Sequence, residues 1–139
     1  MTLQGQCMCG AVRVAATPSK DFMTACNCEN CRRWTGGVNY TFAVDETTAQ
    51  ITGPVKTVSV VDWAERGFCA DCGSGVFYRI TADGPNHGLL KLSAGLFPAG
   101  TDLRLGVEYY ADQRPPQFDL SQPHETLTSE EVRALLSAN

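Results

Sequence analysis

Residues 69–75 read Cys-Ala-Asp-Cys-Gly-Ser-Gly, a Cys-x-x-Cys turn followed by two glycines in three positions. A second turn, residues 7–10, reads Cys-Met-Cys-Gly. A glycine after such a turn lets the chain leave with positive φ and frees backbone N–H groups to point at sulfur. Two separated cysteine pairs can deliver four thiolates to one tetrahedral ion, which zinc prefers where its role is structural. The two turns therefore predict a zinc-stabilised fold.

Residues 26–31 read Cys-Asn-Cys-Glu-Asn-Cys and bring the total to seven cysteines. An odd number cannot be fully paired as disulfides in one chain, and clustered free thiols indicate metal or redox chemistry. Three protein ligands with a fourth position left for water or substrate is the arrangement of catalytic zinc. We therefore predict two zinc ions per chain, one on a group of four cysteines and one on the group of three.

Spacing alone leaves other partitions of the ligands open. The middle group can borrow a cysteine from either pair, and His87 or His124 can serve as a fourth ligand. The middle group can also hold a purely structural zinc or act as a redox switch.

Bulk properties fit one soluble domain. The chain has 139 residues, a formal net charge of −4 and 43% hydrophobic residues. An acidic balance gives no electrostatic attraction to nucleic acid, so we expect no such partner. No apolar run approaches the roughly 20 residues that cross a bilayer. The first six residues lack the basic and apolar regions of a signal peptide, so we expect a cytoplasmic protein with no membrane partner.

Short β-rich runs punctuated by Gly and Pro dominate the rest of the chain, which is typical of an all-β domain. The predicted strands cover residues 12–16, 38–44, 55–61, 76–78, 89–92 and 103–110. A short helix is expected from Glu29 to Trp34, ending at Gly36. Thr128 and Glu131 have the spacing of a capping box ahead of a short C-terminal helix. We predict a mostly β fold of short antiparallel strands, with residues 1–139 forming a single domain.

Residues 6–14, 26–37 and 66–74 resemble, in the same order, the motifs of the glutathione-dependent formaldehyde-activating enzyme family, which includes centromere protein V. The resemblance implies a mostly β zinc fold shared with methionine sulfoxide reductase B. Many members carry His where this chain has Asn27. The resemblance also implies which cysteines share an ion: a structural zinc on Cys7, Cys9, Cys69 and Cys72, and a second, catalytic zinc on Cys26, Cys28 and Cys31.

A zinc ion on three thiolates carries a net charge near −1 and suits a soft ligand such as a substrate thiolate. We therefore expect a carbon–sulfur lyase that makes or breaks adducts of a thiol and an aldehyde. The resemblance implies glutathione and formaldehyde as the type reaction. The alternatives are a non-catalytic zinc-stabilised binding module and, third, a methionine sulfoxide reductase.

Glutathione is anionic, so cations and backbone N–H groups are expected near the second zinc. The candidate substrate-binding residues are Arg32, Arg33, Gly36, Gly37 and Arg66. Trp34 and Trp63 can line a pocket, but core packing is the expected role of both.

Overall fold

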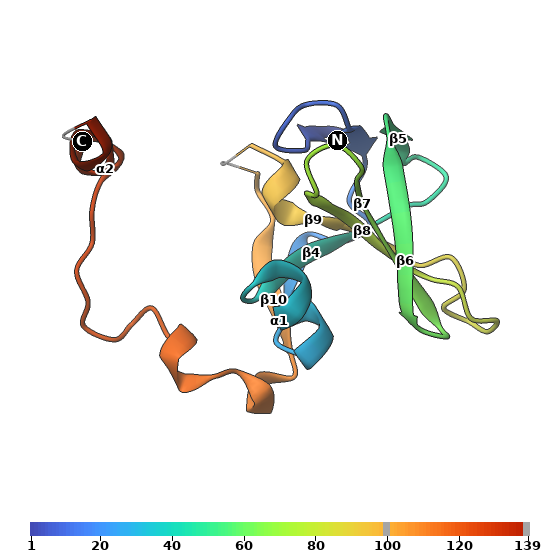
Figure 1. The fold of residues 1–139 in the computed structure, drawn as a ribbon. Coiled ribbons are helices and arrows are strands. Elements are labelled where there is room, and N and C mark those ends of the chain that lie inside the picture. Colours follow the sequence, from blue (N-terminus) through green and yellow to red (C-terminus); the bar gives the residue numbers. More distant parts are fainter. Residues whose placement is uncertain (99–100, 138–139) are drawn as a thin grey trace.

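The computed structural model describes residues 1–98 and 101–137, and the strands in this part of the chain form two sheets (Figure 1). The smaller sheet has the order β1 (Leu3–Gln6), β2 (Arg13–Ala16), β5 (Gln50–Thr52). The larger sheet has the order β10 (Arg104–Tyr109), β3 (Phe22–Cys26), β4 (Asn39–Val44), β9 (Leu90–Ser93), β8 (Gly75–Ile80), β7 (Ala64–Cys69), β6 (Val55–Val61). The prediction of a mostly β fold is confirmed.

Neighbouring strands run antiparallel, as predicted, with one exception. β10 pairs in parallel with β3, so the two strands end at the same edge of the sheet, where Tyr109 lies opposite Cys26. This pairing brings the end of β10 beside Cys26, the first cysteine of the middle group. All six predicted strands are present, each within two residues of its expected bounds.

The two helices form where the capping signals indicated. Helix α1 (Glu29–Thr35) is capped at its start by Cys28, whose Sγ accepts from the N–H of Cys31 at 3.3 Å, and at its end by Gly36, which has φ 81°. Helix α2 (Ser129–Ser137) is preceded by the predicted capping box. The N–H of Thr128 donates to Glu131 at 2.7 Å, and the N–H of Glu131 donates to Thr128 Oγ1 at 3.2 Å.

The hydrophobic core takes side chains from both sheets and from the 3-10 helix η1 (Ala94–Leu96), so it lies between the sheets. Its members include Val14 of β2, Phe42 of β4 and Leu92 of β9. Phe42 meets Phe97 edge to face with ring centroids 5.0 Å apart. Cys7 and Cys69 belong to the same buried cluster. The four-cysteine group therefore lies at the edge of the core. Any interaction that joins its sulfurs would also stabilise the fold.

The chain beyond β10 leaves the sheets. It passes through the short 3-10 helices η2 (Ala111–Gln113) and η3 (Pro116–Phe118) and reaches α2 apart from the rest of the molecule (Figure 1). The side chains of α2 are exposed along its whole length. Among the described residues, no helix combines the length and apolar character needed to cross a membrane.

Candidate metal centres and the cavity beside them

The sulfur atoms gather in two groups. Those of Cys7, Cys9, Cys69 and Cys72 all lie within 4.8 Å of one another, and so do those of Cys26, Cys28 and Cys31. Neither group contains a histidine in the described part of the chain. His87 instead lies on the surface, with Nδ1 within 3.2 Å of the carbonyl oxygens of Thr81 and Ala82.

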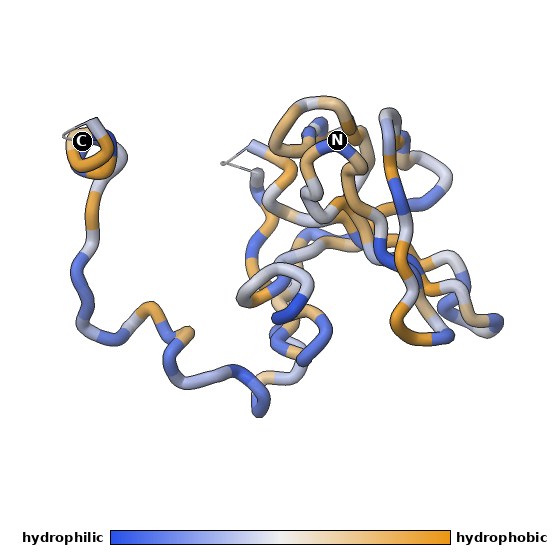
Figure 2. Tube along the Cα trace, viewed as in Figure 1, coloured by the Kyte–Doolittle hydropathy of each residue, from blue (hydrophilic) through white to orange (hydrophobic). Residues whose placement is uncertain are grey.

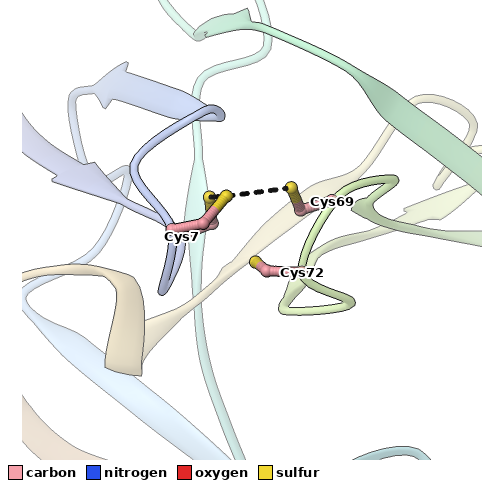
Figure 3. A group of neighbouring side chains, drawn as sticks. Cys7, Cys69 and Cys72 are labelled. Atoms are coloured by element: carbon pink, nitrogen blue, oxygen red, sulfur yellow. Dashed lines mark hydrogen bonds between the residues drawn. The ribbon is translucent and has the colours of Figure 1, made fainter.

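The geometry of the four-cysteine group fits a tetrahedral ion. Metal–sulfur bonds of about 2.3 Å in a tetrahedron separate the sulfurs by about 3.8 Å. The sulfur of Cys9 lies 3.6 Å from that of Cys7 and 3.8 Å from that of Cys69. Figure 3 shows Cys69 and Cys72 on one turn facing Cys7 across the gap. The donor set and its spacing therefore fit zinc.

Backbone and hydroxyl donors surround these sulfurs, as the glycines after each turn led us to expect. Gly10 and Gly73 both adopt φ 81°. The N–H of Val12 donates to Cys7 Sγ at 3.2 Å, and Ser74 Oγ lies 3.2 Å from Cys72 Sγ. The Ser74 hydroxyl and N–H lower the pKa of Cys72 to about 5. These donors stabilise negative charge on sulfur, the state in which cysteine binds a metal.

The three-cysteine group forms where β3 turns into α1. Cys26 ends β3, Cys28 caps α1, and Cys31 lies one turn into the helix, so all three sulfurs point to one side. Two further donors reach Cys31 Sγ: Asn39 Nδ2 and a guanidinium nitrogen of Arg66, each at 3.6 Å.

The close approach of Cys26 and Cys31 separates the pKa values of their two thiols. The neighbouring Cys26 thiol lowers the pKa of Cys31 to about 5, opposed by burial and helped by Arg66 and Asn39. Cys31 in turn raises the pKa of Cys26. Like charges this close disfavour each other, so one sulfur holds the charge and another the proton. A bound cation removes this conflict, and three clustered thiols are therefore a suitable donor set for zinc.

Strand register places a row of polar side chains beside this group. Arg66 of β7 lies opposite Tyr78 of β8, and Tyr78 lies opposite Lys91 of β9. Residues directly opposite in antiparallel strands point to the same face of a sheet. The neighbouring positions Phe77 and Leu92 are also opposite each other and point to the other face, into the core.

This polar face is the floor of a cavity of about 450 Å³. The three cysteines form one wall, and Trp63 of the β6–β7 turn and Tyr110 after β10 also line it. Arg66 is held in place by two rings, with its guanidinium carbon 5.3 Å from the centroid of Tyr78 and 5.8 Å from that of Trp34. Burial lowers the pKa of Lys91, and the nearby Cys26 and Cys31 partly offset this by raising it. The cavity therefore places two cations beside a group of thiols that is suited to a soft metal ion.

The structure brings one of the five predicted substrate-binding residues, Arg66, to this cavity. Arg32 instead donates from Nε to the backbone oxygen of Asn27 at 3.1 Å. Arg33 is exposed and pairs with Glu29 at 2.8 Å. Gly36 caps α1, and the N–H of Gly37 donates to the Thr35 hydroxyl at 3.2 Å. Arg32, Arg33, Gly36 and Gly37 are not among the residues that line the cavity, and their binding role stays a prediction.

Several cavity residues escaped the sequence prediction. Trp63 was expected in the core, yet it is 52% exposed and lines the cavity, whereas Trp34 packs edge to face on Phe68. Lys91 carried a usable signal, since it is a single charge inside the apolar run Leu89–Leu92. Tyr78 and Asn39 carried none, because their placement depends on which strands pair.

Fold and site together define a small, mostly β protein with two cysteine groups suited to metal ions, one of them in the wall of a cavity. Residues 2–113 match the family described as glutathione-dependent formaldehyde-activating enzyme, and the chain belongs to that family. It is similar to an uncharacterized lyase of Schizosaccharomyces pombe, with 25% identity over 130 residues that cover 93% of each chain. A crystal structure of a Rhodobacter sphaeroides protein has a similar fold, with a TM-score of 0.58, 19% identity and coverage of 76% of this chain and 99% of that one.

Proposed function

We propose that this protein is a zinc-dependent carbon–sulfur lyase that makes or breaks the adduct of a small thiol and an aldehyde. The observation that carries the proposal is the position of the three-cysteine group in the wall of a cavity that also contains Arg66 and Lys91. The family description and the lyase name of the yeast relative support the same class. Glutathione and formaldehyde are the first substrates to test.

Each cysteine group has its own role in this proposal. Cys7 and Cys69 lie in the buried core cluster, so their group would hold a structural zinc. A second zinc on Cys26, Cys28 and Cys31 would keep a fourth position at which a substrate thiol binds and loses its proton at neutral pH.

Three side chains of the cavity would balance the charge of the thiolates or position the cysteines and the substrate. The Arg66 guanidinium faces Cys31 Sγ at 3.6 Å. It would offset the negative charge of the three cysteine thiolates and of the substrate thiolate. Asn39 Nδ2, at 3.6 Å from the same sulfur, would fix its orientation. Lys91 lies on the cavity floor and would attract an anionic group of the substrate.

The reaction requires no electron donor or acceptor. In the direction of addition, the sulfur attacks the carbonyl carbon and a C–S bond forms. The π pair of the carbonyl moves to oxygen, which takes up the proton that the thiol lost. In the lyase direction each of these changes is reversed, and the products are thiol and aldehyde.

Exchange spectroscopy with ¹³C-formaldehyde and glutathione tests the proposal. The zinc-loaded protein should accelerate interconversion of free and adduct formaldehyde, and Cys31→Ser should remove the acceleration while retaining the fold. A protein that binds glutathione without any acceleration would instead be a binding module. Turnover of methionine sulfoxide with a dithiol reductant would indicate the reductase alternative.

We further propose that residues 1–139 act as one domain and that the protein works in a reducing compartment such as the cytoplasm. All seven cysteines are free, and clustered thiols of this kind persist where disulfides do not form.

A further inference from the structure

The mouth of the cavity is lined by large apolar side chains that solvent reaches. On one side, Val60 and Trp63 of the β6–β7 hairpin are 66% and 52% exposed. On the other side, Tyr109 and Tyr110 at the end of β10 are 42% and 55% exposed. We call these four residues the apolar rim. Figure 2 shows the hydrophobic colour at the end of β6 where the hairpin turns. Exposed apolar groups gathered around one cavity are typical of a ligand-binding surface.

The two tyrosines of the rim are held in place by the backbone. Tyr110 has φ 54°, the left-handed conformation, which a bulky residue rarely adopts. Its carbonyl oxygen accepts from the N–H of Gln113 at 2.9 Å. The carbonyl oxygen of Tyr109 accepts from the N–H of Asn27 at 3.1 Å. A strained aromatic residue fixed at the edge of a cavity indicates that its position serves binding.

The charges of the cavity lie deeper than the rim. Lys91 Nζ lies 4.7 Å from the centroid of the Tyr109 ring, and Arg66 lies against Cys31. Within the described part of the chain, neither cation forms an ion pair with a carboxylate. The cavity therefore has a group of thiols suited to a soft metal ion and two cations at its base, and apolar walls at its mouth.

We propose that the substrate of this cavity carries an aromatic or branched aliphatic group, which lies between the two sides of the apolar rim. The inference rests on the proposed thiol–aldehyde chemistry and specifies its substrate class. Formaldehyde adds only two heavy atoms to a thiol, and the two arms of glutathione that flank its cysteine both end in charged groups. Neither offers an aromatic or branched aliphatic group to lie against Val60, Trp63 and the two tyrosines. A thiol with a carboxylate near the sulfur and an apolar side group matches both the base and the mouth.

Two matched thiols test the inference: 3-mercaptopropanoate and 2-benzyl-3-mercaptopropanoate, which differ only by the benzyl group. Their Kd values are measured by calorimetry on the zinc-loaded protein, and a cobalt(II)-loaded sample reports sulfur ligation through its charge-transfer band. The benzyl thiol should bind at least about tenfold more tightly, because ring burial of this size stabilises by more than one decade of affinity.

Trp63→Ala should remove most of this gain, so that the Kd values of the two thiols become nearly equal. The variant should fold, because Trp63 is half exposed and its contacts to Thr81 and Ala82 use the backbone oxygen. Leu105→Ala is the matched control, since Leu105 is 49% exposed on β10 and is not among the cavity-lining residues. This control should keep the full gain.

The outcomes separate the two proposals. Equal Kd values for the two thiols, with a normal cobalt band, would overturn the apolar substrate class and leave the thiol chemistry intact. A benzyl gain that survives Trp63→Ala, or that Leu105→Ala also removes, would overturn the placement on the rim. If neither thiol binds or shifts the cobalt band, the proposed function fails and the inference fails with it.

Discussion

Asn27 donates two hydrogen bonds to the carbonyl oxygen of Tyr109, one from its backbone N–H at 3.1 Å and one from Nδ2 at 3.2 Å. The bonds join the loop between Cys26 and Cys28 to the end of β10. Asn27 is fully buried although its side chain is polar. A single residue therefore joins the loop between two of the sulfurs to the end of β10, where the two tyrosines of the apolar rim lie.

Asn27→Ala should destabilise the zinc-loaded protein by about 1–3 kcal/mol, because Tyr109 loses a buried donor. Asn27→Asp should cost more, since it keeps the shape but places a carboxylate against a carbonyl oxygen. Urea unfolding at fixed zinc concentration measures both. Wild-type stability in the two variants would show that the side-chain bond to Tyr109 contributes nothing.

Loss of one cysteine should have different consequences in the two groups. Cys69→Ser should unfold the domain, because structural zinc contributes roughly 10–16 kcal/mol in small zinc-binding peptides and Cys69 lies in the core cluster. Cys31→Ser should retain the fold and reduce the zinc content from two ions per chain to one. Circular dichroism and native mass spectrometry measure the two effects. A folded Cys69→Ser protein with a collapsed Cys31→Ser protein would reverse the roles of the groups.

Arg66→Met should weaken zinc binding at the three-cysteine group by about 10–100-fold, the usual effect of removing a group that contacts a metal ligand. Arg66→Lys should restore part of the affinity, because it keeps the charge but lacks the planar fork that fits between Tyr78 and Trp34. Chelator competition measures the affinity.

Arg33→Met is the matched comparison for Arg66, since Arg33 is exposed and pairs with Glu29 on the surface. We expect it to leave the affinity for zinc unchanged. A larger effect at Arg33 than at Arg66 would support the substrate role that the sequence predicts for Arg33.

Gly53→Ala should destabilise the protein by about 1–3 kcal/mol or more. Gly53 has φ 104°, and a Cβ there would lie 2.1 Å from the carbonyl oxygen of Ala11, at the junction of β5 with the first cysteine turn. Gly95→Ala is the control, because a Cβ at that position meets nothing within 4 Å. Thermal unfolding measures the difference, and equal Tm values for the two variants would contradict the strain at Gly53.

Local chemistry made much of the fold predictable. Cysteine spacing predicted a group of four and a group of three, because such turns determine the local backbone by themselves, and the family resemblance implied which cysteines belong to each group. The capping box at Thr128 and Glu131 worked for the same reason. Strands β1, β3, β5 and β7 were missed. β7, which reads Ala-Glu-Arg-Gly-Phe-Cys, has two charged residues and a glycine, which mask the apolar alternation expected of a strand.

The cavity was less predictable, because its residues come together through register rather than through spacing. Arg66, Tyr78 and Lys91 are far apart in the sequence and meet only because β7, β8 and β9 pair as they do. Arg32 and Arg33 were chosen for their proximity to Cys31 along the chain. A helix turns successive side chains by about 100°, so adjacency to a ligand does not bring a residue to the ligand's side.

The alternation of strands β8 and β9 has a consequence for how this protein can diverge. Phe77 and Leu92 face the core, and their immediate neighbours Tyr78 and Lys91 face the cavity. Mutation at the cavity-facing positions can therefore alter ligand preference while the adjacent positions preserve stability. A sheet used in this way lets selection act on recognition and on folding separately, one residue apart, and allows a single scaffold to acquire different substrates without being rebuilt.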